Sequence, residues 1–159
     1  MRAFLVLATL TLISAASPVR AEDGEGNAPG VAYASAFAHV PTGVLVDVRA
    51  WDDTRDNARI KSSFTEALNR RGVPLTDRDS ALTLNFETRV ESLADGSNAK
   101  TRYILRVTLD NQMTGQRLWE AEARYTGAMV QDVWAFAAMA PILIDGFGKN
   151  LPPKSFRIQ

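Results

Sequence analysis

Three segments of alternating polarity decide the fold: ALTLNFETRVESL at residues 81–93, TRYILRVTLDN at residues 101–111 and RLWEAEARYT at residues 117–126. In each segment apolar side chains occupy every second position, which is typical of a strand with one buried face. The apolar sets are Leu82, Leu84, Phe86 and Val90, then Tyr103, Leu105, Val107 and Leu109, and finally Trp119, Ala121, Ala123 and Tyr125. The sequences DGSN and NQMTGQ lie between the segments and supply turns, so we expect an antiparallel meander.

Charged side chains alternate with these apolar sets. They are Glu87, Arg89 and Glu91 on the first segment, Arg102 and Arg106 on the second, and Glu120, Glu122 and Arg124 on the third. Arginines on the middle strand would face glutamates on its neighbours, which predicts a cross-strand charge ladder. Its expected role is to keep that face of the sheet solvated, and a ligand-binding platform is the alternative.

A further strand and a helix precede the meander. Residues 44–51 (VLVDVRAW) alternate and predict a strand. Asp53 or Thr54 then supplies a helix N-cap, and apolar residues follow at helical spacing. These apolar residues are Ile60, Phe64, Ala67 and Leu68. Gly72 suits the position after a helix and Pro74 forbids continuation, so the helix is expected over residues 54–71.

The last predicted element is an apolar helix over residues 130–149. One stripe of it comprises Val130, Val133, Trp134, Ala137, Ala140, Ile144 and Phe147, and it is widened by Phe136, Met139 and Leu143. Pro141 predicts a kink or break near Met139 and Ala140. The element order β-α-β-β-β-α predicts an α+β two-layer sandwich, with an antiparallel sheet of about four strands and two helices on one face.

The start of the chain has the layout of a secretory signal peptide. A basic residue at Arg2 precedes an apolar run, and Val19 and Ala21 occupy the positions that a signal peptidase reads. Cleavage after Ala21 would leave 138 of the 159 residues, enough for one domain. We therefore expect a signal peptide at 1–21, a flexible leader at 22–43, one α+β domain at 44–150 and a C-terminal tail at 151–159, with a periplasmic or secreted location.

Composition narrows the function classes. Arg2 and Arg20 leave with the signal peptide, so 16 basic and 18 acidic residues remain and a formal charge of −2 gives no reason to expect a nucleic-acid partner. The chain has no cysteine, which excludes disulfides, thiolate metal sites and attachment of a lipid to cysteine. No transmembrane segment is expected in the mature chain.

Candidate catalytic residues are few. His39 is the single histidine and is read as incidental, because catalytic and metal-binding histidines need partners. Asp52, Asp53 and Asp56 are clustered, but aspartates at a helix start are expected to cap it. We therefore predict no cofactor and no enzymatic activity, with a metal-dependent enzyme using the three aspartates as the third-ranked hypothesis.

Three passages resemble small periplasmic and outer-membrane-associated α/β proteins of the bacterial envelope, including domain-of-unknown-function families and assembly or transport auxiliary proteins. They are the helix end at 67–73 (ALNRRGV), the strand with Leu82, Leu84 and Phe86, and the hairpin at 109–119 (LDNQMTGQRLW), which is similar to a D-x(3)-TG-x(2)-LW pattern. The resemblance covers residues 44–126 and implies binding or assembly rather than catalysis.

The first functional hypothesis is thus an exported accessory protein that docks an envelope protein, or a second copy of itself, through its last helix. The residues expected to bind the partner are Trp134, Phe136, Met139, Leu143 and Phe147. The alternative is a carrier of a small hydrophobic ligand or lipid, with a pocket between sheet and helices. That pocket would be lined by Phe86, Tyr103, Trp119 and Tyr125, with Phe136 contributed by the last helix.

Overall fold

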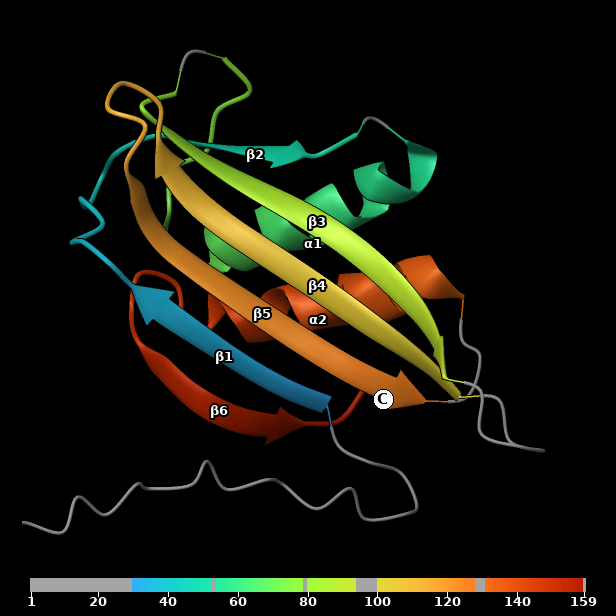
Figure 1. Ribbon diagram of the computed structural model, residues 1–159. Helices are drawn as coiled ribbons and strands as arrows, with labels where there is room; N and C mark the ends of the chain where they lie inside the picture. The colour runs from blue at the N-terminus through green and yellow to red at the C-terminus, as the bar shows by residue number, and fades with distance from the viewer. Residues whose placement is uncertain (1–29, 53, 79, 94–99, 128–130, 159) are drawn as a thin grey trace, which may run out of the picture.

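The chain folds into a six-stranded mixed sheet with two helices packed against it (Figure 1). The computed structural model describes residues 30–52, 54–78, 80–93, 100–127 and 131–158, so the predicted signal peptide lies outside the described residues. The elements are β1 (Gly30–Ala36), β2 (Val46–Ala50), α1 (Arg55–Arg70), β3 (Leu82–Leu93), β4 (Lys100–Asn111), β5 (Arg117–Gly127), α2 (Asp132–Ile144) and β6 (Leu151–Phe156). The α+β class stands, but an antiparallel sheet of about four strands is wrong.

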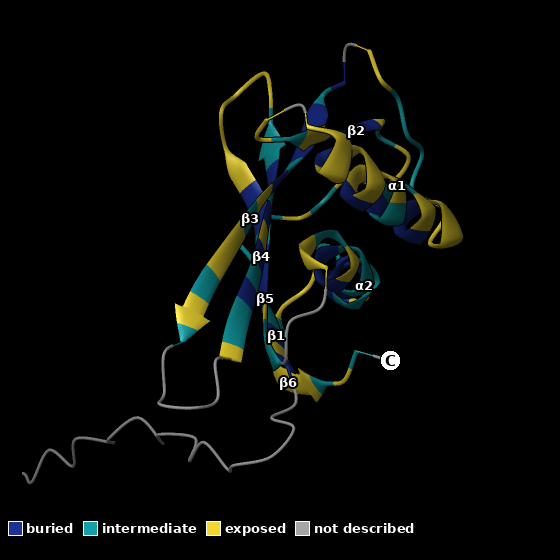
Figure 2. Cartoon of the chain, turned by 90° about the vertical axis from the view of Figure 1, so that its right-hand side faces the viewer, coloured by how far each residue is buried: buried dark blue, intermediate teal, exposed yellow. Residues whose placement is uncertain are grey.

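The strand order β2-β3-β4-β5-β1-β6 explains where the helices lie. β2 and β3 are parallel and are joined through α1. β5 and β6 are both antiparallel to β1, so they run in the same direction, and α2 joins them. From β2 to β3, and again from β5 to β6, the chain moves toward the β6 edge of the sheet. Crossovers between parallel strands are almost always right-handed, so two crossovers that move in the same direction place their helices on the same face. Figure 2 shows α1 and α2 on the same side of the sheet.

β1 lies inside the predicted leader, so the assignment of residues 30–36 to a flexible segment is wrong. This strand pairs with β5 over six residues, and Ala32 and Ala34 lie opposite Ala123 and Ala121. A strand whose inward residues are alanines is hard to predict from alternating polarity, because the alanine side chain is small and only weakly hydrophobic. The missing information is tertiary, because these alanines are buried only through the contact with β5 and α2.

β6 corrects the predicted C-terminal tail. Residues 151–156 pair antiparallel with β1, with Leu151 opposite Ala34 and Phe156 opposite Gly30. Pro152 and Pro153 argue against a strand by sequence because proline cannot donate to the ladder. An edge strand tolerates them, since one side of its backbone needs no partner.

α1 follows the sequence closely. Thr54 is the N-cap and its side chain accepts a hydrogen bond from the Asn57 N–H at 3.3 Å. The four apolar residues predicted for its inner face are buried, and Gly72 has a φ of 70° just after the helix. Glycine adopts this left-handed conformation without a steric cost, which ends the helix where the pattern predicted.

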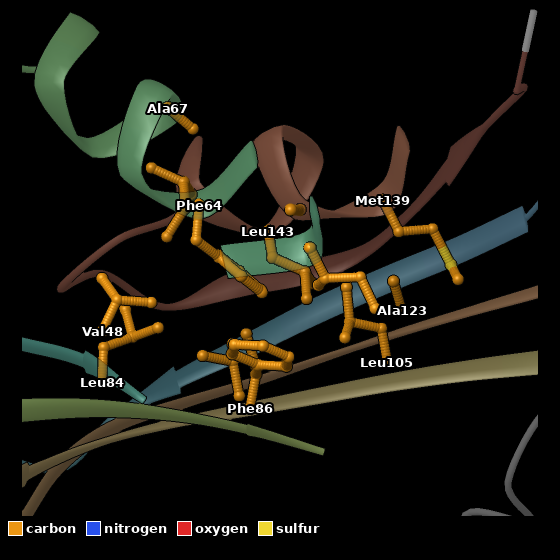
Figure 3. Packing of buried hydrophobic residues seen from close by; sticks show 14 of the residues in the cluster. Val48, Phe64, Ala67, Leu84, Phe86, Leu105, Ala123, Met139 and Leu143 are labelled. Atoms are coloured by element: carbon orange, nitrogen blue, oxygen red, sulfur yellow. The ribbon is translucent and has the colours of Figure 1, made fainter. Parts of the chain in front are cut away.

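The core lies between the sheet and the two helices. Phe64 of α1 contacts Phe86 of β3 with ring centroids 5.3 Å apart, and Figure 3 shows Met139 and Leu143 of α2 pointing toward the sheet. α2 continues through Pro141 to Ile144, so the predicted break near residues 139–140 is not seen. In the described part of the chain, no helix has both the length and the apolar character needed to span a membrane.

Two aromatic residues of α2 provide a test of this packing. Phe136 is 3% exposed and lies edge-on to Tyr103 at 5.8 Å, whereas Trp134 is 49% exposed. We expect Phe136→Ala to lower the free energy of unfolding by about 3–5 kcal/mol, because it leaves a cavity in the core. Trp134→Ala is the control and should cost about 1 kcal/mol or less. Urea unfolding of both variants measures this, and equal losses would contradict the packing described.

Candidate functional site

Most residues predicted to bind a partner belong to the core instead. Phe136, Met139 and Leu143 are fully or almost fully buried, and Phe147 packs against Trp119 with ring centroids 5.4 Å apart. Trp134 is the exposed member of the set. The guanidinium of Arg59 lies 3.5 Å from its ring centroid, so α1 and α2 are joined there by a cation–π contact. The inner face of α2 is therefore covered by this chain's own sheet and α1.

The residues predicted to line a ligand pocket also lie in the interior. Phe86, Tyr103 and Trp119 are at most 2% exposed. The Tyr103 ring contacts both Phe136 and Tyr125, and the Trp119 indole Nε1 donates to the backbone carbonyl of Lys149 at 3.1 Å. These side chains fill the space between sheet and helices that the carrier hypothesis requires to be open.

The aspartate cluster has structural partners. Asp52 accepts hydrogen bonds from the Asn57 side chain through its backbone and its carboxylate, while Asp53 lies outside the described residues. Within the described ranges, no group of three or more histidine, cysteine, aspartate or glutamate side chains is arranged to hold a metal ion. Asp52 therefore fastens the turn before α1 to the first turn of that helix.

The most specialised polar arrangement lies on the sheet face that the helices leave open. The Glu122 side chain, on β5, is only 4% exposed. Its Oε2 accepts from Nε and Nη2 of Arg106 on β4 at 3.0 and 2.8 Å, and its Oε1 accepts from Nε of Arg124 at 2.5 Å and from the Tyr33 hydroxyl on β1 at 2.9 Å. Four donors from three strands thus converge on one carboxylate.

These contacts set the protonation of the cluster. Burial acts to raise the pKa of Glu122, but hydrogen bonds from Arg106, Tyr33 and Arg124 outweigh it and hold that pKa below its usual value. Burial and the hydrogen bond to Glu122 raise the pKa of the Tyr33 hydroxyl. Glu122 is therefore an anion and Tyr33 a neutral donor at neutral pH.

The predicted charge ladder is confirmed at two cross-strand pairs. Arg106 bridges to Glu122, and Arg102 lies 3.6 Å from Glu91. A second pair, on β2, copies the geometry of Arg124 and Glu122: the Arg49 Nε lies 2.5 Å from the carboxylate of Asp47, which is 5% exposed. The prediction of a fully solvated ladder is incomplete, because Tyr33 and the arginines cover Glu122.

A second candidate site is apolar and is formed by loops. The loop-end groove, about 490 Å³ in volume, is lined by residues 39–44, Val46, residues 71–74 and residues 147–149. His39 lines it, and Arg71 and Lys149 are exposed on it. Phe37 and Leu45, both about half exposed, flank the loop that forms one wall.

Trp51 stands out at the opposite end of β2. Its side chain is 85% exposed, although its backbone N–H donates to the Phe86 carbonyl at 3.2 Å and so continues the ladder. Asp52, the next residue, and Asp56, in the first turn of α1, are also exposed. A large exposed indole on a fixed backbone is typical of a contact residue, since burying it on a partner removes much apolar surface from water.

Sequence reasoning missed three of these features for definable reasons. Tyr33 lies in the segment read as a leader, so its hydrogen bond to Glu122 could not be foreseen. The loop-end groove joins three loops that are distant in sequence. Trp51 was assigned to a strand face, and only the short length of β2 leaves it beyond the sheet.

Comparison with known proteins identifies the fold. No protein-family model matches the sequence, and no curated protein matches it. Among solved structures, the chain is similar to the PelC dodecamer from Paraburkholderia phytofirmans, with a TM-score of 0.51 and 13% identity over 77% of this chain and 99% of that chain. It is also similar to a PDZ domain protein from Parabacteroides distasonis (TM-score 0.45, 11% identity, 74% of this chain and 36% of that chain).

A minor lipoprotein from Acinetobacter baumannii is a further structural neighbour, with a TM-score of 0.39 and 16% identity over 65% of this chain and 85% of that chain. The likeness to PelC spans nearly all of that chain and shows that the two proteins share a fold. At 13% identity the property shared with PelC is the architecture of sheet and helices.

The buried carboxylate makes stability depend on pH. Because the pKa of Glu122 is lower in the folded chain, its ionised form favours folding, and this contribution is complete above the ordinary carboxyl pKa of 4.5 and is lost as the pH falls through the folded-state pKa. We expect Glu122→Gln to lower the free energy of unfolding by about 1–3 kcal/mol at neutral pH.

Urea unfolding at a series of pH values measures the effect. The difference between the wild type and Glu122→Gln should shrink in acid, where the wild-type carboxyl is also neutral. Glu120→Gln is the matched control, because its side chain is 42% exposed on the same strand and it should change stability little. A loss for Glu122→Gln that is independent of pH would count against the assignment.

Proposed function

We propose that this chain is an exported accessory protein of the bacterial cell envelope that acts by binding and works as a homo-oligomer. The observation that carries the proposal is the presence of an exposed indole, Trp51, and of the loop-end groove at opposite ends of β2. The contact surface predicted on α2 is replaced by these two features, because the apolar side chains of α2 are mostly used in the core.

Shape supports a contact between copies. Trp51 is an exposed aromatic knob, and the groove is an apolar hollow flanked by Phe37 and Leu45. Different surfaces on one chain that fit each other make a head-to-tail contact, and repetition of such a contact closes a ring when the rotation allows it. Central aromatic anchors of this kind dominate the energy of protein interfaces.

Charge supports the same contact. The groove carries the exposed cations Arg71 and Lys149, whereas Asp52 and Asp56, both exposed, follow Trp51 in the chain within five residues. Docking Trp51 of one copy into the groove of the next would place opposite charges around the apolar centre. Such complementarity steers association and disfavours the reversed orientation.

The structural neighbour adds support from the fold. PelC, which shares this architecture over 99% of its chain, is described as a dodecamer. A fold that forms a dodecamer in one protein is a reasonable scaffold for self-association in another.

Sedimentation velocity of residues 22–159 over a wide range of protein concentration tests the proposal. The wild type is expected to form a discrete oligomer. Trp51→Ser should weaken the association by at least about thirtyfold, because it removes the anchor. Trp134→Ser is the matched control and should assemble as the wild type does. A wild type that stays monomeric, or equal effects of the two substitutions, would refute the proposal.

A charge reversal makes the test more specific. Asp52→Lys and Arg71→Glu should each weaken assembly. An equimolar mixture should restore part of it, because a contact between unlike variants pairs either the two reversed charges or the two wild-type residues. Failure of the mixture, with both variants folded by circular dichroism, would place the contact elsewhere.

The groove also favours a second candidate function, the binding of a small apolar ligand. Its volume of about 490 Å³ falls in the range of known ligand pockets, roughly 300–1,000 Å³. Native mass spectrometry of the purified chain should then show a co-purified compound that is lost in a Val44→Lys variant. Masses that are whole multiples of the polypeptide mass, with no added compound, would favour the oligomer.

A further inference from the structure

The open face of the sheet contains a hollow that the proposed assembly does not use. It has a volume of about 240 Å³ and is lined by four arginines, three glutamates and Ile104. We name it the polar-face hollow. It lies over β3, β4 and β5 on the side opposite to the helices, and the strand register places Arg106 between Glu87 and Glu122. The polar-face hollow and the loop-end groove share no lining residue.

The charges in the polar-face hollow do not cancel. Glu122 is covered and accepts hydrogen bonds from Arg106 and Arg124, so its charge is compensated inside the sheet face. Glu91 lies 3.0 Å from Arg89 and 3.6 Å from Arg102, so it is compensated at the rim. Four guanidinium groups against three carboxylates leave a surplus of one positive charge.

The two central arginines are held and yet accessible. Arg106 and Arg124 are fixed by the same carboxylate, but their side chains remain 57% and 55% exposed. A guanidinium group carries five N–H donors in a planar fork, so one ion pair leaves donors for another acceptor. Their orientation is fixed before any ligand arrives, which reduces the entropy lost on binding.

We propose that the polar-face hollow binds a small oxyanion, a phosphate or carboxylate group, between Arg106 and Arg124. Planar guanidinium forks match the oxygen geometry of both groups, and charge-assisted hydrogen bonds of this kind are the strong ones. Glu87 lies opposite Arg106 on β3 and repels anions, so the bound group sits on the side of β5. Glu122 is the positioning residue, because it fixes both arginines and does not itself contact the anion.

Titration of residues 22–159 with inorganic phosphate, and separately with acetate, tests this site. Backbone amide shifts of β4 and β5 should change saturably with at least one of the two anions, and the effect should weaken as NaCl is raised because the site is partly exposed. Arg124→Gln should weaken the binding by at least about tenfold. Arg124→Lys keeps the charge but lacks the fork, so it should lose less.

Arg49→Gln is the matched control. Arg49 forms the same type of ion pair, through Nε to a nearly buried carboxylate two residues away, but it lies outside the polar-face hollow. Its loss should leave the titration unchanged. Shifts that do not saturate, or that change equally in the Arg49 and Arg124 variants, would overturn the proposal.

A second experiment, vesicle sedimentation, distinguishes a lipid headgroup from a free anion as the ligand. Vesicles of phosphatidylglycerol and of phosphatidylcholine are sedimented with the wild type and with Arg124→Gln. Retention on phosphatidylglycerol alone, lost in the variant, identifies a lipid headgroup, whereas saturable binding of free anion without retention identifies a soluble ligand. Absence of both kinds of binding overturns the proposal. The oligomeric state is measured independently, so failure here leaves the Trp51 contact unaffected.

Discussion

The two helical crossovers, from β2 to β3 and from β5 to β6, progress across the sheet in the same sense, and this constraint places both helices against one face. The single apolar core follows from it, since the strands bury apolar side chains in the layer beneath the two helices. The opposite face has no layer to cover it. Polar side chains there must satisfy one another or water, which explains why ion pairs gather on that face.

Glu122 shows how far this mutual satisfaction goes. Its carboxylate is removed from water on a face with no covering layer, and hydrogen bonds from β4, β5 and β1 compensate for that. Burial of a paired charge adds little net stability compared with an apolar packing, but it restricts the geometry strongly. The register between β4, β5 and β1 is therefore specified on both faces, by alanine packing on one and by the carboxylate on the other.

The sequence predicted those elements whose signals are local. α1 has a cap, a periodic apolar face and a terminal glycine, and β3, β4 and β5 alternate clearly. β1 and β6 were missed because their place in the sheet depends on partners: alanines that become core only beneath α2, and prolines that only an edge strand accepts. The cluster around Glu122 was predicted incompletely for the same reason, since Tyr33 lies on β1. α2 was misjudged because a helix that is apolar on nearly all sides signals burial as much as docking.

The prolines of β6 have a consequence for aggregation. An edge strand with free N–H groups is a template on which another chain can add a strand, and Pro152 and Pro153 lack N–H groups. Because successive residues of a strand point to opposite sides, the pair removes one donor from the outer side of this edge. At the other edge, the start of β2 is already paired, because the Val46 N–H donates to the Pro74 carbonyl and the Val46 carbonyl accepts from the Thr76 N–H, both at 3.0 Å. The sheet is thus poorly suited to grow into a fibril by strand addition, and copies of the chain can meet at high local concentration without polymerising through their backbones.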